Sequence, residues 1–306
     1  MSELILHHYT LSPFSRKVRS VLGYTQLPWQ SALTREMPPR PVLDHLVGGY
    51  RKIPVAQIGS DVFCDSRTIC TEIAQLANKP ELDVANVSGE IQAFVSEADV
   101  KLFFACIGQS VSWKLNKKVL KQMSLLDLAK FMIDRINIGR NMKTPVLKPA
   151  EAKVYLKNYV ADLEQRLEQQ PFLFGSSPNA ADFAVYHCFW FMRDVAEKPT
   201  FGGFEKFNGW LDRIAAFGEG NVSEINAEST LEIARASEPR PIDDQWKQDS
   251  AVGQQVSIAP ADYACDTTQG IQVGSSDDRW IISRSDSAVG KVHVHFPKQG
   301  FALKPL

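Results

Sequence analysis

The spacing of apolar residues changes twice along the chain and divides it into three parts. In the first part, short apolar runs predict strands at 4–8, 29–33, 53–59 and 61–64. Apolar residues three and four positions apart predict helices with one buried face at 13–23, 42–46 and 65–77. Gly59 and Ser60 fit a two-residue turn that joins the last two strands into a hairpin. The predicted order is therefore β-α-β-α-β-β-α.

The second part, from Val87 to about Arg235, has helical spacing and no strand signal. Long periodic runs lie at 89–108, 124–136, 149–169, 180–195, 204–217 and 228–236. They predict an all-helical domain. Asn179 and Asp182 have the spacing of an N-terminal capping box, and the helix that follows them is apolar on nearly every side. We therefore expect that helix to lie at the centre of the helical domain.

The third part begins after "SEPRPIDD" and alternates between apolar and polar residues. Its short stretches lie at 271–274, 279–285 and 291–296, separated by Gly, Asp and Ser. This pattern predicts a small antiparallel sheet. About 50 residues are too few for an independent core, so we expect the sheet to pack against one of the first two domains. The predicted domain boundaries are 1–80, 86–236 and 240–306.

Composition removes several classes of partner. The 306 residues include 34 Lys and Arg against 35 Asp and Glu, so the net charge of -1 predicts no binding to nucleic acid or to an anionic membrane. No targeting segment is evident, and no apolar run approaches the roughly 20 residues that span a bilayer. The five cysteines form no C-x-x-C pair and fit reduced, mostly buried thiols. We expect a cytoplasmic protein.

Candidate chemistry gathers at two predicted helix starts in the first part. Asp65 and Ser66 stand where free backbone N–H groups and the helix dipole favour an anionic ligand. Ser12 precedes Pro13, which suits the cap and the first position of a helix. Pro54 opens a strand because it cannot donate to a ladder, and its spacing alone favours a trans bond.

The order of these features resembles the cytosolic glutathione transferase family, in its serine-type bacterial and fungal members. A strand, "SPFSRKVR", a strand, "KIP", a hairpin and "DSRTI" precede the helical domain. The most specific pieces are "IPVAQIGSDVFCDSRTI" and "GSSPNAADFAVYH". The resemblance covers residues 1 to about 235 and implies an α+β/α architecture. It consists of a thioredoxin-like domain and an all-helical domain, and the small antiparallel β-rich extension at 240–306 is an addition.

The resemblance also implies that the chain binds glutathione. Ile53 would pair its backbone with the cysteinyl part, and Pro54 would then be cis. Asp65 and Ser66 match the acid and serine that hold the γ-glutamyl end through its ammonium and its carboxylate. Lys52 matches a position whose side chain contacts the glycyl carboxylate in some members. A tripeptide held at both ends would have its thiol between them.

A serine at a helix start can stabilise the thiolate form of that thiol by enough free energy to ionise it near neutral pH. Lowering a thiol pKa from about 8.5 by about 2 units takes roughly 2.7 kcal/mol. One hydrogen bond to a charged acceptor gives about 1.5–3 kcal/mol, and a helix N-terminus adds about 0.3–1 kcal/mol. Ser12 matches the activating serine of the family, Tyr9 is the alternative, and Ser15 is expected to support the cap or to be solvated.

Other residues bear on redox chemistry, the core, the substrate pocket and the dimer interface. "SPFS" lacks the cysteines of C-P-x-C, which excludes thiol–disulfide exchange by a resolving pair. The alternation along 61–64 points Cys64 into the core. Phe14, Phe104 and Trp113 are candidates for the pocket of a small hydrophobic electrophile, and core packing explains each of them equally well. Arg67 matches an arginine at the family's dimer interface and points to a homodimer.

The histidines are expected to be structural. His293 and His295 share a strand face, but no third or fourth metal ligand accompanies them, so we expect a packed sheet face and no metal. His7 and His8 point to opposite sheet faces, and one of them is expected to face solvent.

Two hypotheses about function remain open at this point. In the first, the chain is a glutathione transferase whose Ser12 stabilises a thiolate for attack on an electrophile, or for an isomerisation or peroxide reduction. In the second, it keeps the fold and the glutathione clamp as a non-catalytic binding or regulatory protein. Fold alone does not separate the two. The extension could shield the site, replace the usual dimer contact or recruit a partner.

Overall fold

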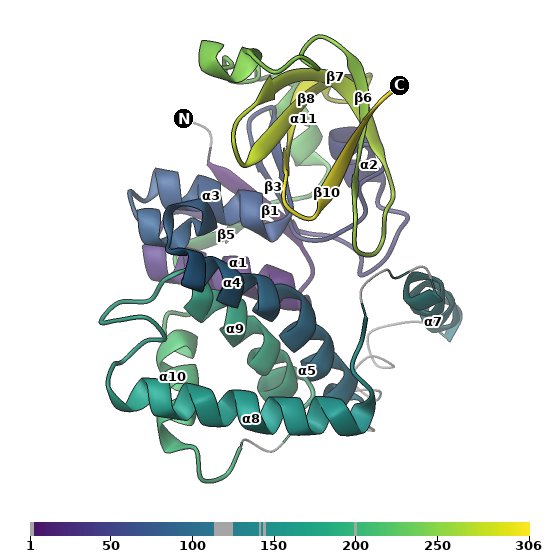
Figure 1. Cartoon of the computed structure of the whole chain (residues 1–306). Helices are drawn as coiled ribbons and strands as arrows, with labels where there is room; N and C mark the ends of the chain where they lie inside the picture. The colour runs from purple at the N-terminus through teal and green to yellow at the C-terminus, as the bar shows by residue number, and fades with distance from the viewer. Residues whose placement is uncertain (1–2, 113–124, 141, 143–144, 199–200) are drawn as a thin grey trace.

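The structure is a computed structural model that describes residues 3–112, 125–140, 142, 145–198 and 201–306. Figure 1 shows a helical half below and a sheet-rich half above, the latter including the chain's C-terminal strands. Within the described residues, no helix combines the length and apolar character needed to cross a membrane.

The first part has the predicted order of elements. They are β1 (Leu4–His8), α1 (Pro13–Thr25), β2 (Trp29–Leu33), α2 (Pro41–Val47), β3 (Val55–Ile58), β4 (Asp61–Cys64) and α3 (Ser66–Leu76). Strand β1 lies between β2, to which it is parallel, and β3, to which it is antiparallel. Strands β3 and β4 form the expected hairpin. The predicted fold class is confirmed here, and Cys64 is buried as expected.

Short turns of helix, η1 (Pro80–Leu82) and η2 (Val84–Asn86), lead into the helical part. Its helices are α4 (Gly89–Glu97), α5 (Phe103–Ser110), α7 (Leu125–Arg140), α8 (Pro149–Glu168), α9 (Ala180–Trp190) and α10 (Glu205–Ala215). A π-helical segment, η3 (Ala98–Leu102), joins α4 to α5, and another, η4 (Phe191–Val195), extends α9. The long helix that the periodicity predicts at 89–108 is thus continuous through α4 and α5.

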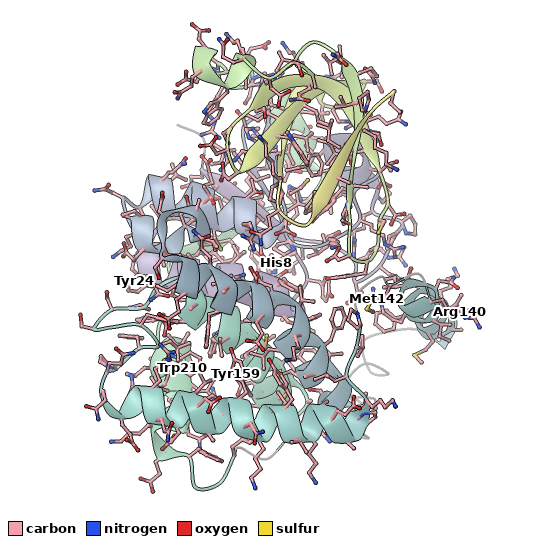
Figure 2. All side chains as sticks on the ribbon, in the orientation of Figure 1. His8, Tyr24, Arg140, Met142, Tyr159 and Trp210 are labelled. Carbon is pink, nitrogen blue, oxygen red and sulfur yellow. The ribbon has the colours of Figure 1, made fainter. Side chains whose placement is uncertain are left out.

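The capping box predicted for the central helix is present. The backbone N–H of Asn179 donates to Asp182 Oδ2 at 2.9 Å, and Ala181 N–H donates to Asn179 Oδ1 at 2.9 Å. Asp182 Oδ1 also accepts from the indole of Trp210 on α10 at 2.8 Å. Figure 2 labels Trp210 in the helical half. Every described side chain of α9 except that of Trp190 is buried, as expected for a central helix.

The extension forms the predicted antiparallel sheet. Its strands are β6 (Gln255–Pro260), β7 (Thr268–Ser275), β8 (Arg279–Asp286), β9 (Gly290–Pro297) and β10 (Phe301–Pro305), after a short helical turn, η5 (Asp244–Lys247). Strand β9 pairs in parallel with β4, matching Asp61 with His293 and Phe63 with His295. Within the described residues the strands therefore make one sheet in the order β10-β6-β7-β8-β9-β4-β3-β1-β2-β5. The extension packs on the first part, as expected.

The prediction that residues 87–235 contain no strand is wrong at one place. Strand β5 (Val222–Glu224) pairs in parallel with β2, and the indole of Trp29 on β2 donates to Glu219 O at 2.8 Å just before β5. Its side chains are all exposed, so no apolar alternation marks it. Helix α11 (Ser229–Arg235) then packs on α2 and β9 rather than within the helical part. The boundary at 236 therefore stays a prediction.

The expectation that His7 or His8 faces solvent is wrong. His7 is 0% and His8 3% exposed, since β1 is an inner strand of the sheet. His7 lies 3.1 Å from Gln57 Oε1 and His8 lies 2.9 Å from Ser31 Oγ. The expected packing of the 293–295 face is confirmed by His295, whose ring stacks on Phe63 at 4.5 Å and whose Nε2 lies 2.8 Å from Asp61 Oδ1.

Buried histidines predict a loss of stability in acid. Burial lowers the pKa of each to about 4; they are His7, His8, His187 and His295. The unfolded chain binds their protons near pH 6.5 and the folded chain does not, so the free energy of unfolding falls as pH drops from about 6.5 to 4. Burial raises the pKa of Asp182 to about 6, so this carboxyl has the opposite effect on the free energy of unfolding, but it is one group against four histidines.

A histidine with these two pKa values loses about 2 kcal/mol between pH 7 and pH 5. We expect urea denaturation to show at least that fall in the free energy of unfolding. An equal or higher free energy of unfolding at pH 5 would contradict the burial of these imidazoles in neutral form.

Candidate functional site

Three chain segments meet at one edge of the first part's sheet. Val55, the first residue of β3, pairs with His7 of β1 and with Cys64 of β4. Pro54 directly precedes Val55, and Asp65 directly follows Cys64. The turn from β1 into α1 leaves the sheet at the same edge. The N-termini of α1 and α3 are therefore brought together beside Pro54.

Ser12 caps α1 as the sequence predicts. Its Oγ accepts from the backbone N–H of Ser15 at 3.2 Å, and Pro13 occupies the first turn. Ser12 is 2% exposed. A hydroxyl that accepts one hydrogen bond keeps its own proton for another acceptor. Ser15 supports the cap through its backbone, but its hydroxyl is buried and has no partner among the described residues, so it is not solvated.

Asp65 and Ser66 stand at the start of α3 with unused polar atoms. Asp65 Oδ1 accepts from Arg67 N–H at 2.9 Å, and no described residue bonds its second oxygen or the hydroxyl of Ser66. Asp65 has φ +77° and ψ 141°, a conformation that costs a non-glycine residue energy and that concentrates at ligand sites. The Ile53–Pro54 bond is cis, as the family resemblance implies.

Lys52 has a partner that the sequence does not suggest. Its Nζ donates to Asp262 Oδ1 at 2.7 Å and lies 3.9 Å from the ring centre of Tyr263. Both partners come from the 261–267 loop, which connects β6 to β7 in the extension. Lys52 and Asp262 are 210 residues apart in the sequence, so no local pattern links them. The extension therefore reaches the candidate site.

Among the aromatic candidates, Phe104 lies beside this loop. Its ring meets Tyr263 edge-on at 5.6 Å between centroids. Phe14 packs on Phe103 and on His187, each at 4.8 Å, and so contributes to packing between α1 and the helical part. Trp113 lies outside the described residues.

Arg40 is a buried cation that lies near Tyr9. Arg40 is 6% exposed, and its guanidinium donates to Arg35 O at 2.7 Å and to Arg51 O at 2.5 Å. Burial lowers the pKa of Arg40 to about 10, and nearby Tyr9 opposes this shift. No described carboxylate forms an ion pair with Arg40. A buried cation of this kind was not singled out from the sequence, since "MPPRP" reads only as a loop.

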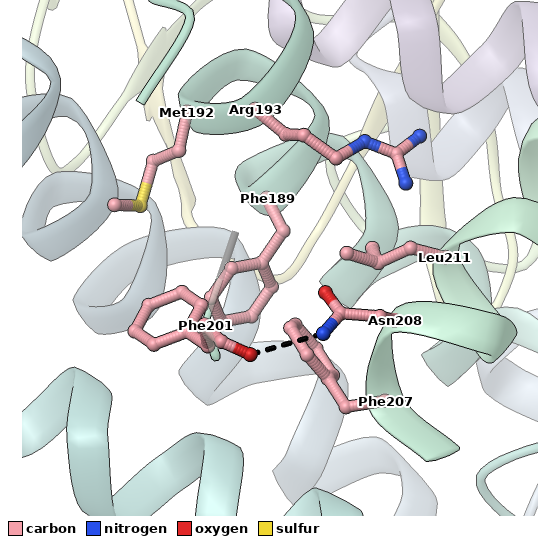
Figure 3. Close-up of a pocket in the computed structure, with 7 residues that line it drawn as sticks. All are labelled: Phe189, Met192, Arg193, Phe201, Phe207, Asn208 and Leu211. Atoms are coloured by element: carbon pink, nitrogen blue, oxygen red, sulfur yellow. Dashed lines mark hydrogen bonds between the residues drawn. The ribbon is translucent and has the colours of Figure 1, made fainter. Parts of the chain in front are cut away.

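A hollow lies away from this edge, in the helical part. Figure 3 shows it between the end of α9 and α10, lined mainly by rings and methyl groups. The amide of Asn208 donates to Phe201 O at 3.0 Å across it. Phe189 and Phe207 meet edge-on at 4.9 Å. These contacts are those of a packed core and add no chemistry to the site.

Comparison with known proteins gives family and fold matches. Residues 6–81 match the model of the glutathione S-transferase N-terminal domain, and residues 150–213 match that of the C-terminal domain. No curated protein matches the sequence. A GST-like protein from Pseudomonas syringae is 29% identical over 100% of both chains, with a TM-score of 0.80. That protein therefore shares the extension.

More distant solved structures align with part of the chain. A glutathione S-transferase from Rhodospirillum rubrum F11 is 14% identical over 70% of this chain and 88% of its own, with a TM-score of 0.47. A glutathione S-transferase from Methylobacillus flagellatus KT, solved with GSH bound, is 16% identical over 72% of this chain and 100% of its own, with a TM-score of 0.46.

Proposed function

We propose that the chain, whose residues 6–81 and 150–213 match the two domains of the glutathione S-transferase family, binds glutathione and ionises the thiol for attack on a small hydrophobic electrophile. The observation that carries this proposal is the pair of helix starts at one sheet edge. Ser12 caps one of them and Ser66 opens the other with its hydroxyl unused by any described residue.

The tripeptide would be held from the γ-glutamyl end. The Asp65 carboxylate is suited to its ammonium, while the Ser66 hydroxyl and the first N–H groups of α3 are suited to its carboxylate. The backbone of Ile53 would pair with the cysteinyl residue. This arrangement directs the thiol toward the start of α1, where the Ser12 hydroxyl donates to the sulfur after the thiol proton has left for solvent.

The thiolate would attack the electrophile and form a carbon–sulfur bond. In a substitution the leaving group departs into water with its bonding electron pair, and in an addition the resulting carbanion takes a proton from water. Phe104 and Tyr263 supply aromatic surface beside the site for a small hydrophobic substrate. All five cysteines are free thiols, which fits a reducing compartment such as the cytoplasm.

A non-catalytic glutathione-binding protein is the second candidate. It is favoured by the burial of Ser12, whose Oγ already serves the helix cap, and by the loop of the extension that holds Lys52. A glutathione-dependent isomerase or peroxidase would use the same thiolate. A homodimer stays a proposal. The guanidinium of Arg67, which the family resemblance places at its interface, donates to Gln299 of the extension at 2.6 Å.

Ser66→Ala tests the clamp. Losing a hydrogen bond to a charged carboxylate costs about 1.5–2 kcal/mol, so we expect glutathione to bind about 10- to 30-fold more weakly. Calorimetric titration measures this directly. Ser88→Ala is the matched control, since Ser88 caps α4 away from the sheet edge and should leave binding unchanged. Equal binding by wild type and Ser66→Ala would contradict the clamp.

A further inference from the structure

The 261–267 loop of the extension occupies the candidate glutathione site at Lys52. The side chain of Lys52 is 12% and that of Asp262 29% exposed, and they form an ion pair at 2.7 Å. The ammonium also lies on the face of Tyr263, 3.9 Å from the ring centre. Lys52 is therefore held by a carboxylate and by a ring, and both belong to the extension.

Tyr263 of this loop also lies near Asp65 at the start of α3. Burial raises the pKa of Tyr263, and the charges of Asp262 and Asp65 raise it further, which places Tyr263 near both. Tyr50 is 3% exposed, and its hydroxyl has no partner among the described residues. Burial raises its pKa as well, with Asp65 as the next cause. Figure 1 shows the connection between β6 and β7 extending downward from the extension.

A bound tripeptide would bring a second carboxylate to this place. Its glycyl carboxylate needs a cation, and Lys52 is already neutralised by Asp262. Two carboxylates beside one partly buried ammonium repel each other, because the protein interior screens charge less than water does. The ligand and Asp262 therefore compete for the same donor.

We propose that Asp262 is a specificity-determining residue of the glutathione site, whose carboxylate stands where the C-terminal carboxylate of the ligand binds Lys52. The proposal rests on the function proposed above. Ligand binding exchanges one ion pair of Lys52 for another and moves the loop aside. The loop is suited to this because Ala261, Cys265, Asp266 and Thr267 are all exposed. Affinity then depends on the group at the C-terminal end of the ligand.

The proposal is tested by titrating two ligands into two proteins. The ligands are glutathione and its C-terminal amide, and the proteins are wild type and Asp262→Asn, each titrated by calorimetry. Asp262→Asn removes the competing charge, so glutathione is expected to bind about tenfold more tightly. The amide carries no carboxylate for Lys52, so its affinity is expected to change less than about twofold.

Asp266→Asn is the matched control. Asp266 lies in the same loop, is 48% exposed and pairs with Arg51 at 3.8 Å, so its loss should affect the two ligands equally. Weaker glutathione binding by Asp262→Asn, or equal changes for acid and amide, would overturn the competition while leaving the proposed function in place. If neither protein binds either ligand, the proposed function is wrong and the role of Asp262 falls with it.

Discussion

Replacing Ser12 with alanine is expected to raise the pKa of the bound glutathione thiol by about 2 units and to slow turnover about 50-fold at pH 6.5. The hydrogen bond from Ser12 to a charged sulfur contributes about 1.5–3 kcal/mol, a range that includes the roughly 2.7 kcal/mol that such a shift requires, and the helix start itself remains in the variant. Turnover follows the thiolate fraction, which falls by that factor when a pKa near 6.5 returns to about 8.5. Thiolate absorbance against pH gives the pKa, and conjugation of a generic electrophile gives the rate.

The experiment must distinguish the effect of Ser12 on helix stability from its effect on the thiol pKa. Ser12 also accepts from Ser15 N–H, and losing a cap costs about 0.5–2 kcal/mol of stability. Ser12→Thr keeps a hydroxyl and should retain the low thiol pKa, and Ser88→Ala loses a cap on α4 and should leave the thiol unaffected. A shift produced by Tyr9→Phe and not by Ser12→Ala would assign the activation to Tyr9 instead.

Glu72→Gln is expected to lower the free energy of unfolding by about 3–5 kcal/mol. Glu72, on α3, is 2% exposed and bonds Arg240 at 2.6 Å, and its other oxygen lies 3.6 Å from Arg279. Both arginines belong to residues 240–306. Removing the carboxylate leaves Arg279, itself 5% exposed, as a buried charge without this partner.

Urea denaturation measures this loss. Glu90→Gln is the matched control, because Glu90 pairs with Arg166 at 3.3 Å on the surface, where such a pair contributes about 0–1 kcal/mol. Equal effects of the two substitutions would mean that the extension is not held to the first part by this cluster.

Local signals in the sequence were sufficient for the first part and for the helix starts. The Ser12–Pro13 cap, the Gly59–Ser60 hairpin turn and the box at Asn179 each depend on residues a few positions apart, and each is present. The resemblance to a family added the cis bond at Pro54 and the match of Asp65 and Ser66 to a ligand clamp.

Features that depend on pairing between residues far apart in the chain could not be predicted from the sequence. Strand β9 was recognised as a strand, but its parallel pairing with β4 leaves no periodicity to read. Strand β5 is short and exposed and is fixed by Trp29 on its neighbour. The pairing of Lys52 with Asp262 joins an expected ligand contact to the least predictable part of the chain. The sequence therefore predicted the site residues of the first part and did not predict the contacts of Asp262 and Tyr263 from the extension.

The proposed function requires that glutathione bind at this sheet edge as a thiolate. The most direct measurement follows thiolate absorbance of glutathione bound to the wild-type protein across pH, beside glutathione alone. We expect the thiol of bound glutathione to titrate with a midpoint about 2 pH units below that of the free thiol, near pH 6.5. An unchanged midpoint for bound glutathione, or no bound glutathione at all, would contradict it.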